Sequence, residues 1–324
     1  MFSLRLRMSI LVIILFAILY AIASLIMHYL GVRGFLPQVL LAVGMMLFQY
    51  LVGPKIVELS MHVKYVKKED VPWLFEMVEG LSRRANVPMP KIGIAHINVP
   101  NAFAFGRSLK DGRICVTKGV LDLLNKEELR AVLGHEMTHL KSRDVLFITL
   151  LSVVPLILYY IFLHFSLYGS YSRRRESGGS AALIGIAAFV FYFVTNLLVL
   201  YASRIREYFA DKGSLDLGNS PASLATALYK LVYGAARLPK ENLREIEGVK
   251  AFFLNDLSKA KSEISDLAQL DLDRTGTIDP YELRSLAQKK INLSFADKAM
   301  EILSTHPNML KRIKHLSEYN KGQA

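Results

Sequence analysis

Four long runs without a charged side chain constrain this sequence more than any other feature. A helix needs about 20 mainly apolar residues to cross the hydrocarbon of a bilayer, and each run is long enough. The runs are Met8–Leu30, Phe35–Pro54, Val145–Tyr168 and Ala181–Ala202. The first run is long for a signal peptide and lacks a small-x-small cleavage site. The sequence therefore predicts a multi-pass α-helical membrane protein, with one transmembrane hairpin over residues 1–54 and another over residues 145–202.

Lysine and arginine near the ends of these runs predict the orientation, because basic residues concentrate in short cytoplasmic loops. One side carries Arg5, Arg7, Lys55, Lys64, Lys67, Lys68, Lys141, Arg143, Arg204, Arg206 and Lys212. The other side carries Arg33, Arg173, Arg174 and Arg175. The Arg173–Arg175 cluster opposes the rule, but its group is the smaller one. We therefore expect a cell-membrane protein whose two soluble segments, 55–144 and 203–324, are cytoplasmic.

Composition narrows the class of partner. The formal net charge is +12, although 52% of the residues are hydrophobic. A basic balance favours either nucleic acid or a membrane surface. The sequence has no recognition-helix pattern and no zinc knuckle, and its basic residues flank the apolar runs. We therefore predict the lipid bilayer as a partner and exclude nucleic acid. The single cysteine, Cys115, cannot form an intramolecular disulfide.

The soluble segments contain both helix and strand patterns. Helical periodicity covers Val71–Ala85 and Lys126–Lys141, and the second of these helices is preceded by Asn125. Short strands separated by Pro, Asn and Gly are predicted over Lys91–Ile97, Ala102–Arg107 and Arg113–Thr117. Residues 203–324 have mostly helical patterning. We expect one α+β domain assembled from both segments.

The motif that carries chemistry is Gly134-His135-Glu136-Met137-Thr138-His139. Two histidines four residues apart on a helix lie on one face, one turn apart, so both imidazoles can reach one zinc ion. The intervening Glu136 lies nearby without being a ligand. It can take a proton from the attacking water and pass it to the leaving amine.

A second charged pair follows the fourth apolar run. Glu207 and Asp211 lie four apart in Ser203-Arg204-Ile205-Arg206-Glu207-Tyr208-Phe209-Ala210-Asp211. Glu207 can supply a third ligand and leave one zinc position open for water, as catalytic sites do. Asp211 can accept a hydrogen bond from a ligand histidine. The alternative is an ordinary surface pair of carboxylates beside Lys212.

These motifs resemble those of the HtpX-type membrane zinc endopeptidases, which are related to the CAAX prenyl endopeptidases of eukaryotes. The resemblance extends to Asn101-Ala102-Phe103-Ala104-Phe105-Gly106 and to Thr305-His306-Pro307. It implies a mainly α (α+β), gluzincin-like zinc metallopeptidase domain that acts on membrane proteins or unfolded polypeptides, usually in quality control. It also implies His135, His139 and Glu207 as zinc ligands and Glu136 as the base. By the same resemblance, a substrate-binding strand contains Asn101, Ala102, Phe103 and Ala104.

The ligands lie close to the predicted spans in the sequence, His139 six residues before the third and Glu207 five residues after the fourth. At 1.5 Å per helical residue, both should lie within roughly 10 Å of the membrane surface. We therefore expect cleavage in cytosolic parts of membrane proteins. The alternatives are a prenyl-protein processing peptidase and a catalytically silent scaffold or calcium-responsive adaptor. Candidate donors to the oxyanion are Arg204, Tyr208 and His306.

One loop has no counterpart in that resemblance. Residues 271–282 fit the calcium loop of an EF-hand, with Gly276 at the turn and Thr275 in place of the preferred Asp or Asn. The oxygen ligands would come from Asp271, Asp273, Thr275, Thr277, Asp279 and Glu282. A capped helix–turn–helix without an ion explains the same residues. Both interpretations stay open on the sequence, so Ca²⁺ joins Zn²⁺ as a candidate cofactor.

Overall fold

The computed structural model describes residues 50–168, 178–236, 267, 270–273, 275–289, 291, 293 and 295–319. The predicted span Met8–Leu30 lies outside these residues, as does the part of Phe35–Pro54 that precedes residue 50. The chain divides into two compact units. One comprises Met1–Val52 and Leu146–Ser203, and the other comprises Gly53–Val145 and Arg204–Ala324. The division into membrane and soluble segments stays a prediction.

The second unit contains a four-stranded sheet with the strand order β1-β2-β4-β3. The strands are β1 (Val63–Tyr65), β2 (Lys91–Ala95), β3 (Ala102–Phe105) and β4 (Arg113–Thr117). β2 and β4 are parallel, whereas β1 pairs with β2 and β3 pairs with β4 in antiparallel fashion. Every residue of β4 is buried, which fits a central strand with both faces covered. The strand order makes β3 the last strand at one edge of the sheet.

The three predicted strands are confirmed; β4 has the predicted bounds, whereas β2 and β3 each end two residues earlier than predicted. β2 ends at Ala95 because the Ile97 N–H turns back to the Ala95 carbonyl. β3 ends at Phe105 because Gly106 adopts a φ of 149° that starts a turn. β1 was not predicted, since its three half-exposed residues carry no alternating apolar pattern.

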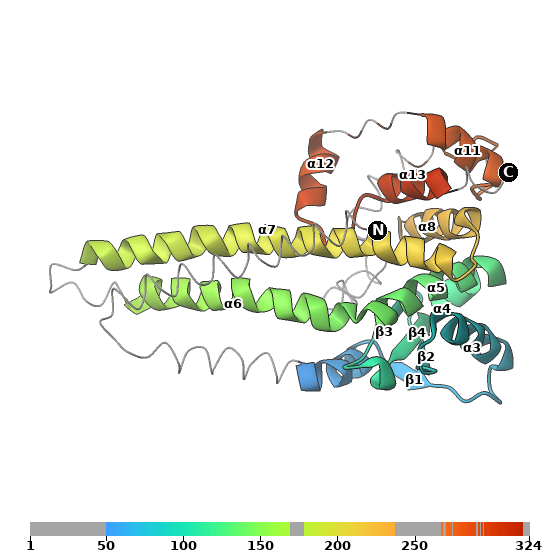
Figure 1. Ribbon diagram of the computed structural model, residues 1–324, viewed down its shortest axis with the longest axis horizontal. Coiled ribbons are helices and arrows are strands. Elements are labelled where there is room, and N and C mark those ends of the chain that lie inside the picture. The colour runs from blue at the N-terminus through green and yellow to red at the C-terminus, as the bar shows by residue number, and fades with distance from the viewer. Residues whose placement is uncertain are drawn as a thin grey trace. The chain divides into compact units, whose positions relative to one another are not determined.

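Two helices pack with the sheet (Figure 1). α3 (Pro72–Ala85) begins with Pro72, and the left-handed conformation of the following residue, Asn86, ends it. α5 (Lys126–Ser142) packs along β3 and against α3. Its first turn carries a capping box, in which the Asn125 side chain accepts the Glu128 N–H and Glu128 accepts the Asn125 N–H. The helix that the sequence predicted after Asn125 is thus confirmed. The short elements η1 (Leu109–Asp111) and α4 (Lys118–Leu123) flank β4.

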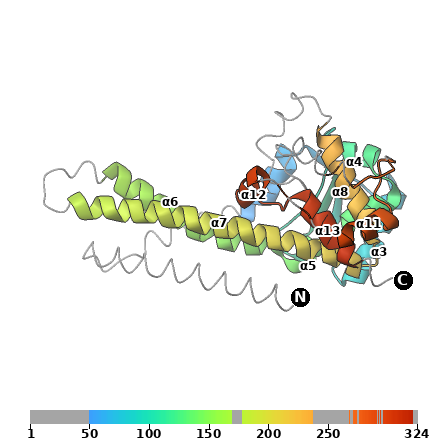
Figure 2. The ribbon, with the colours of Figure 1, turned by 90° about the horizontal axis from the view of Figure 1, so that it is seen from above.

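The C-terminal part of this unit is helical among the described residues. It comprises α8 (Pro221–Ala236), α11 (Pro280–Gln288), α12 (Phe295–Ile302) and α13 (Met309–Tyr319). α13 packs against both α8 and α11, and α8 packs against α5 (Figure 2). Fully buried side chains of Leu228, Leu283 and Ile313 join these helices to the core around the sheet. The second half of the domain therefore closes over the helix that carries the two motif histidines.

The first unit contains most of α6 (Asp144–Tyr168) and of α7 (Gly178–Asp216). Within it, the Phe162 and Phe189 rings lie 5.1 Å apart and the Tyr159 and Tyr192 rings 5.5 Å apart. In the described part of the chain, one helix, Leu183–Asp216 of α7, is long and apolar enough to cross a membrane. Its most apolar 18-residue window has a mean hydropathy of 2.4.

Candidate active site

α5 brings the two motif histidines together. His135 and His139 lie one turn apart, and their Nε2 atoms are 3.0 Å apart. The His135 side chain is fully buried, whereas 18% of the His139 side chain is exposed. Burial lowers the pKa of His135. That histidine is therefore neutral at pH 7, with a lone pair available to a metal ion.

α7 supplies the third member of the cluster. Glu207 Oε2 lies 3.6 Å from His135 Nε2, and Glu207 Oε1 lies 3.5 Å from His139 Nε2. The predicted convergence of these three residues is thus present in the structure, with their ligand atoms all within 4.8 Å of one another. The three residues lie in one compact unit, although about 70 residues separate Glu207 from the motif.

Glycines allow the two ligand-bearing helices to approach closely. A Cβ at Gly213 of α7 would lie 2.3 Å from the Thr138 side chain of α5. A Cβ at Gly134 of α5 would lie 2.2 Å from the Asn219 amide nitrogen. Real Cβ atoms do not tolerate such distances, so these positions exclude any side chain without a rearrangement. The close crossing of α5 and α7 is what places the Glu207 carboxylate beside the imidazoles.

The three residues fit a zinc ion. Two nitrogen ligands at about 2.05 Å from a tetrahedral zinc ion are about 3.4 Å apart, close to the observed spacings. Glu207 Oε2 is buried and lies 3.0 Å from the Arg312 guanidinium, so this carboxylate oxygen faces a positively charged partner, as a ligand of a cation must. Burial alone raises the pKa of Glu207, but the nearby His306 and Arg312 hold this pKa well below its usual value. Among the described residues, the site therefore offers two imidazoles and one carboxylate, which would take three of the four tetrahedral positions.

A carboxylate oxygen lies within hydrogen-bond distance of the Nδ1 atom of each histidine. His135 Nδ1 lies 2.9 Å from Asp211 Oδ1, the partner predicted from the sequence. His139 Nδ1 lies 2.6 Å from Asp144 Oδ2. Because an ionised carboxylate only accepts, both rings carry their proton on Nδ1 and direct the Nε2 lone pair toward the cluster. Asp144 was missed, although it follows His139 by only five residues; Arg143, in a left-handed conformation, turns the chain there.

Two arginines balance these carboxylates. The fully buried Arg312 of α13 donates to both oxygens of Asp211, at 2.9 and 2.6 Å, and its Nη1 lies 3.0 Å from Glu207 Oε2. Burial alone lowers the pKa of Arg312, but Asp211 and Glu207 raise it overall. Arg206 forms an ion pair with Asp144. No sequence pattern pointed to Arg312, because its partner Asp211 lies 101 residues away.

Glu136 lies between the histidines on α5 and is 5% exposed. Burial is the main cause that raises its pKa to about 7, and the nearby Glu207 charge adds to the effect. A carboxylate with such a pKa exchanges protons readily near neutral pH. The Ala104 backbone also forms a hydrogen bond with Glu136. This contact connects the predicted base to edge strand β3.

The predicted substrate strand is placed beside the cluster only in part. Ala102, Phe103 and Ala104 lie on β3. Asn101 precedes the strand and is fully buried. Its backbone N–H donates to Thr117 Oγ1 and its carbonyl accepts from the Thr117 N–H, so its main chain stabilises the sheet. Contact of this segment with a substrate stays a prediction.

The three candidate oxyanion donors lie in different surroundings. His306 Nδ1 is 3.3 Å from Glu207 Oε2, so the structure brings His306 into the cluster. Arg204 instead donates to main-chain carbonyls at the end of α12. The Tyr208 ring packs edge-on against the His315 ring, 5.1 Å away. The polar atoms of the His306 side chain are thus brought to the carboxylate of a predicted ligand.

The EF-hand-like loop, residues 271–282, is held by hydrogen bonds between its own residues. Asp271 accepts the N–H groups of Thr275 and Gly276, while Glu282 accepts those of Leu272 and Asp279. The Thr275 and Thr277 hydroxyls lie 2.9 Å apart. Carboxylate oxygens of Asp271, Asp273 and Glu282 lie within 4.8 Å of one another. The capped helix–turn–helix accounts for these contacts, and calcium binding stays a prediction that calorimetry on the full chain tests.

Comparisons with known proteins agree with this geometry. The model of peptidase family M48 matches residues 68–320. A protein named Protease HtpX homolog from Methanothermobacter thermautotrophicus is 50% identical over 230 residues, covering 71% of this chain and 86% of that protein. Protease HtpX homolog 2 from Methanosarcina acetivorans is 33% identical over 308 residues, covering 94% of this chain and 92% of that protein.

A solved structure extends the likeness to the fold. The crystal structure of S. mikatae Ste24p aligns with a TM-score of 0.52 at 15% identity, covering 98% of this chain and 67% of that one. Together with the convergence of His135, His139 and Glu207, the sequence matches show that this chain belongs to peptidase family M48 and is a metalloprotease.

Proposed function

We propose that this protein is a zinc-dependent endopeptidase of the cell membrane that cleaves membrane proteins, or unfolded polypeptides, on the cytosolic side, in quality control. The observation that carries the proposal is the cluster itself. The His135, His139 and Glu207 ligand atoms meet within 4.8 Å, with the buried Glu136 beside them on α5. A purely structural zinc site would have four protein ligands, whereas the part of the chain that the structure describes supplies three here.

The chemistry follows from the positions of the protein's own groups. When bound, zinc would act as a Lewis acid toward the scissile carbonyl and the attacking water. Glu136 accepts the proton of that water and later delivers it to the leaving amine, a transfer suited to a pKa of about 7. Asp211 and Asp144 keep the two imidazoles in one tautomer and orientation. His306, next to Glu207, is the best-placed donor for the developing oxyanion.

The apolar exterior of α7 supports membrane embedding. Large hydrophobic side chains are exposed along the helix, at Leu183, Ile186, Phe189, Val190, Phe193 and Val194. A patch of this length is unfavourable in water and matches the hydrocarbon of a bilayer. We call the unit that contains the cluster, Gly53–Val145 and Arg204–Ala324, the catalytic unit. The distribution of lysine and arginine supports a cytoplasmic location for it. Four spans remain part of this proposal.

Edge strand β3 supports an extended polypeptide as substrate. It is the last strand of the sheet, and its Ala104 contacts the base Glu136. An extended peptide can add to a sheet edge through main-chain hydrogen bonds, which tolerate many side chains. A binding mode of this kind suits the removal of varied unfolded segments better than the recognition of one sequence.

A topology-resolved cleavage assay tests the proposal. The full chain is reconstituted with a membrane-protein substrate that carries distinguishable tags on its cytosolic and opposite sides, and the products are mapped by mass spectrometry. We expect zinc-dependent cuts on the cytosolic side alone. Glu136→Gln serves as the control, because it should keep bound zinc and lose cleavage. Cuts confined to the opposite side would refute the orientation, and cleavage by Glu136→Gln would assign the base elsewhere.

A further inference from the structure

Ile302 and Leu303 form an exposed apolar pair at the end of α12, within the catalytic unit. We call this pair the α12 tip. The two residues are 51% and 63% exposed, although both are large and aliphatic. We propose that the α12 tip inserts its side chains into the bilayer–water interface next to the active site. The proposal rests on the membrane embedding of α7 proposed above.

Arg204 fixes the α12 tip in place. Its Nη1 donates to the carbonyl oxygens of Glu301 and Ile302, both at 2.9 Å, and of Ser304 at 2.7 Å. The last carbonyls of a helix lack intrahelical partners, and one guanidinium here satisfies several of them. The exposed side chains of Ile302 and Leu303 are thus presented from a backbone that is anchored on α7.

The position of Arg204 along α7 sets the level of the α12 tip. Arg204 follows the apolar run Ala181–Ala202 by two residues. At 1.5 Å per residue this is about 3 Å along the helix, which is the depth of the headgroups if the run spans the hydrocarbon. The main chain that Arg204 binds therefore lies at the interface as well. Apolar side chains at this level reach about 5–10 Å into the boundary between headgroups and acyl chains.

The lipid interface explains both the apolar and the charged character of this site. Ile302 and Leu303 suit the acyl chains, while the exposed Lys298 of α12 suits anionic headgroups. Burial of these two aliphatic side chains among acyl chains would remove apolar surface from water, which is favourable. The α12 tip is also only three residues from His306, which lies beside Glu207. Insertion would therefore hold the site at the membrane surface.

Depth-resolved fluorescence quenching tests this inference on the full chain. Single reporter cysteines are introduced as Ile302→Cys, Leu303→Cys, Phe193→Cys and Tyr281→Cys, each labelled with an environment-sensitive dye. The native Cys115 is fully buried, and burial raises the pKa of its thiol, so it does not compete for the label. The proteins are placed in vesicles of phosphatidylcholine and phosphatidylglycerol. Nitroxide-bearing lipids carry the quencher either near the headgroup or near the chain end.

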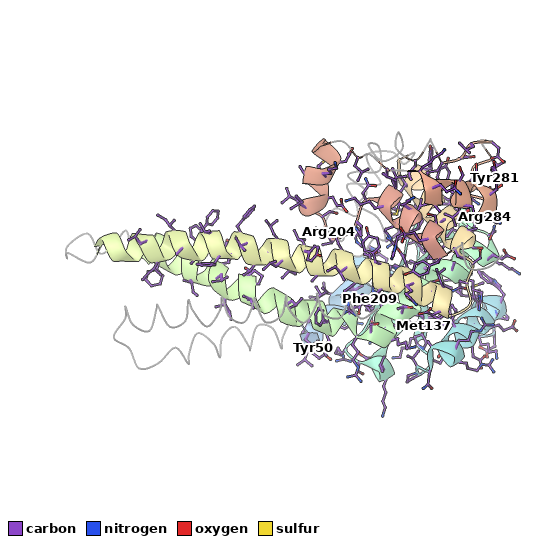
Figure 3. The ribbon with its side chains drawn as sticks, turned by 45° about the horizontal axis from the view of Figure 1, so that its top comes forward. Tyr50, Met137, Arg204, Phe209, Tyr281 and Arg284 are labelled. Carbon is purple, nitrogen blue, oxygen red and sulfur yellow. The ribbon has the colours of Figure 1, made fainter. Side chains whose placement is uncertain are left out.

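The comparison sites separate this inference from the proposal on which it rests. Phe193 is 50% exposed on α7 and reports whether that helix lies in the bilayer. Tyr281 is 71% exposed on α11 in the same unit as the α12 tip, and Figure 3 shows it well apart from Arg204. Tyr281 thus reports an exposed position of the same unit that is distant from Arg204.

We expect strong quenching at positions 302 and 303 by the shallow quencher, strong quenching at 193 by the deep quencher, and none at 281. Quenching at 193 without quenching at 302 and 303 would overturn the inference and leave the membrane helix intact. A blue-shifted but unquenched dye at 302 or 303 would identify a protein partner, such as a second copy, and would also overturn it. No quenching at 193 would instead remove the proposed membrane embedding.

Discussion

His139 Nδ1 lies 2.6 Å from Asp144 Oδ2, and Asp144 is the first residue of α6. A proposed zinc ligand is therefore oriented by the start of the helix that the sequence predicts as the third span. Arg206 of α7 pairs with the same carboxylate. The parts of α6 and α7 that belong to the catalytic unit thus both take part in orienting His139.

Replacing this carboxylate should weaken zinc binding. Asp144→Asn keeps the shape of the side chain but removes the charge that fixes the His139 tautomer, so we expect about 10–100-fold lower zinc affinity. Affinity is measured by competition with a chromogenic chelator. Asp216→Asn is the matched control, since Asp216 is half-exposed on α7 and pairs with Lys212. Equal affinities for Asp144→Asn and wild type would show that this contact does not support the ligand.

The close crossing of α5 and α7 should not tolerate a methyl group. Gly213→Ala would place a Cβ 2.3 Å from Thr138 Cγ2 and 2.8 Å from Thr138 Cβ. The Thr138 Cβ is bonded to the backbone, so a change of rotamer cannot remove this clash. We expect a loss of about 1–3 kcal/mol of stability from overpacking, together with weaker zinc binding as Glu207 shifts.

Gly80→Ala is the control for that substitution. Gly80 lies inside α3, and a Cβ added there would meet no atom within 4 Å, so alanine should stabilise by about 0.5–1 kcal/mol through helix propensity. Thermal unfolding of both variants in detergent measures the difference. A stabilised Gly213→Ala would contradict the proposed close approach.

Arg312 should matter more to the metal-free protein than to the zinc-loaded one. Arg312→Met leaves the buried carboxylates Glu207 and Asp211 without their cation, which costs about 3–5 kcal/mol. A bound zinc ion supplies positive charge to Glu207, so the loss of melting temperature should be smaller with zinc than with chelator. Arg312→Lys keeps the charge without the two-pronged geometry and should fall between Met and wild type. An equal loss of melting temperature with and without zinc would show that Arg312 does not interact with the metal site.

Removing the metal should lower stability reversibly. A ligand present at about 1,000 times its dissociation constant stabilises the folded state by about 4 kcal/mol. We therefore expect a chelator to lower the melting temperature of the wild type and zinc to restore it. His139→Ala provides the control, since it should melt at the same low temperature with or without chelator. A chelator-insensitive wild type would argue against zinc at this cluster.

Local patterns were sufficient to predict much of the site. The spacing of His135 and His139 fixes their relation on any helix, and Asn125 marks where that helix begins. The Glu207–Asp211 pair could be assigned a role for the same reason, because residues four apart share a helix face. Strands β2, β3 and β4 were recognised from turn residues around short apolar segments, whereas β1 was too short and too exposed.

The sequence alone thus determined which residues share a face of one helix or strand, and it predicted membrane spans from the apolar runs. The tertiary structure decided which carboxylate serves which histidine, and it brought Arg312 and His306 to Glu207 from about 100 residues away. It also decided the strand order and the crossing of α5 and α7 at Gly213. The physical reason is range. Backbone periodicity and capping act over a few residues, whereas contacts between distant segments depend on packing of the whole core, which no local pattern encodes.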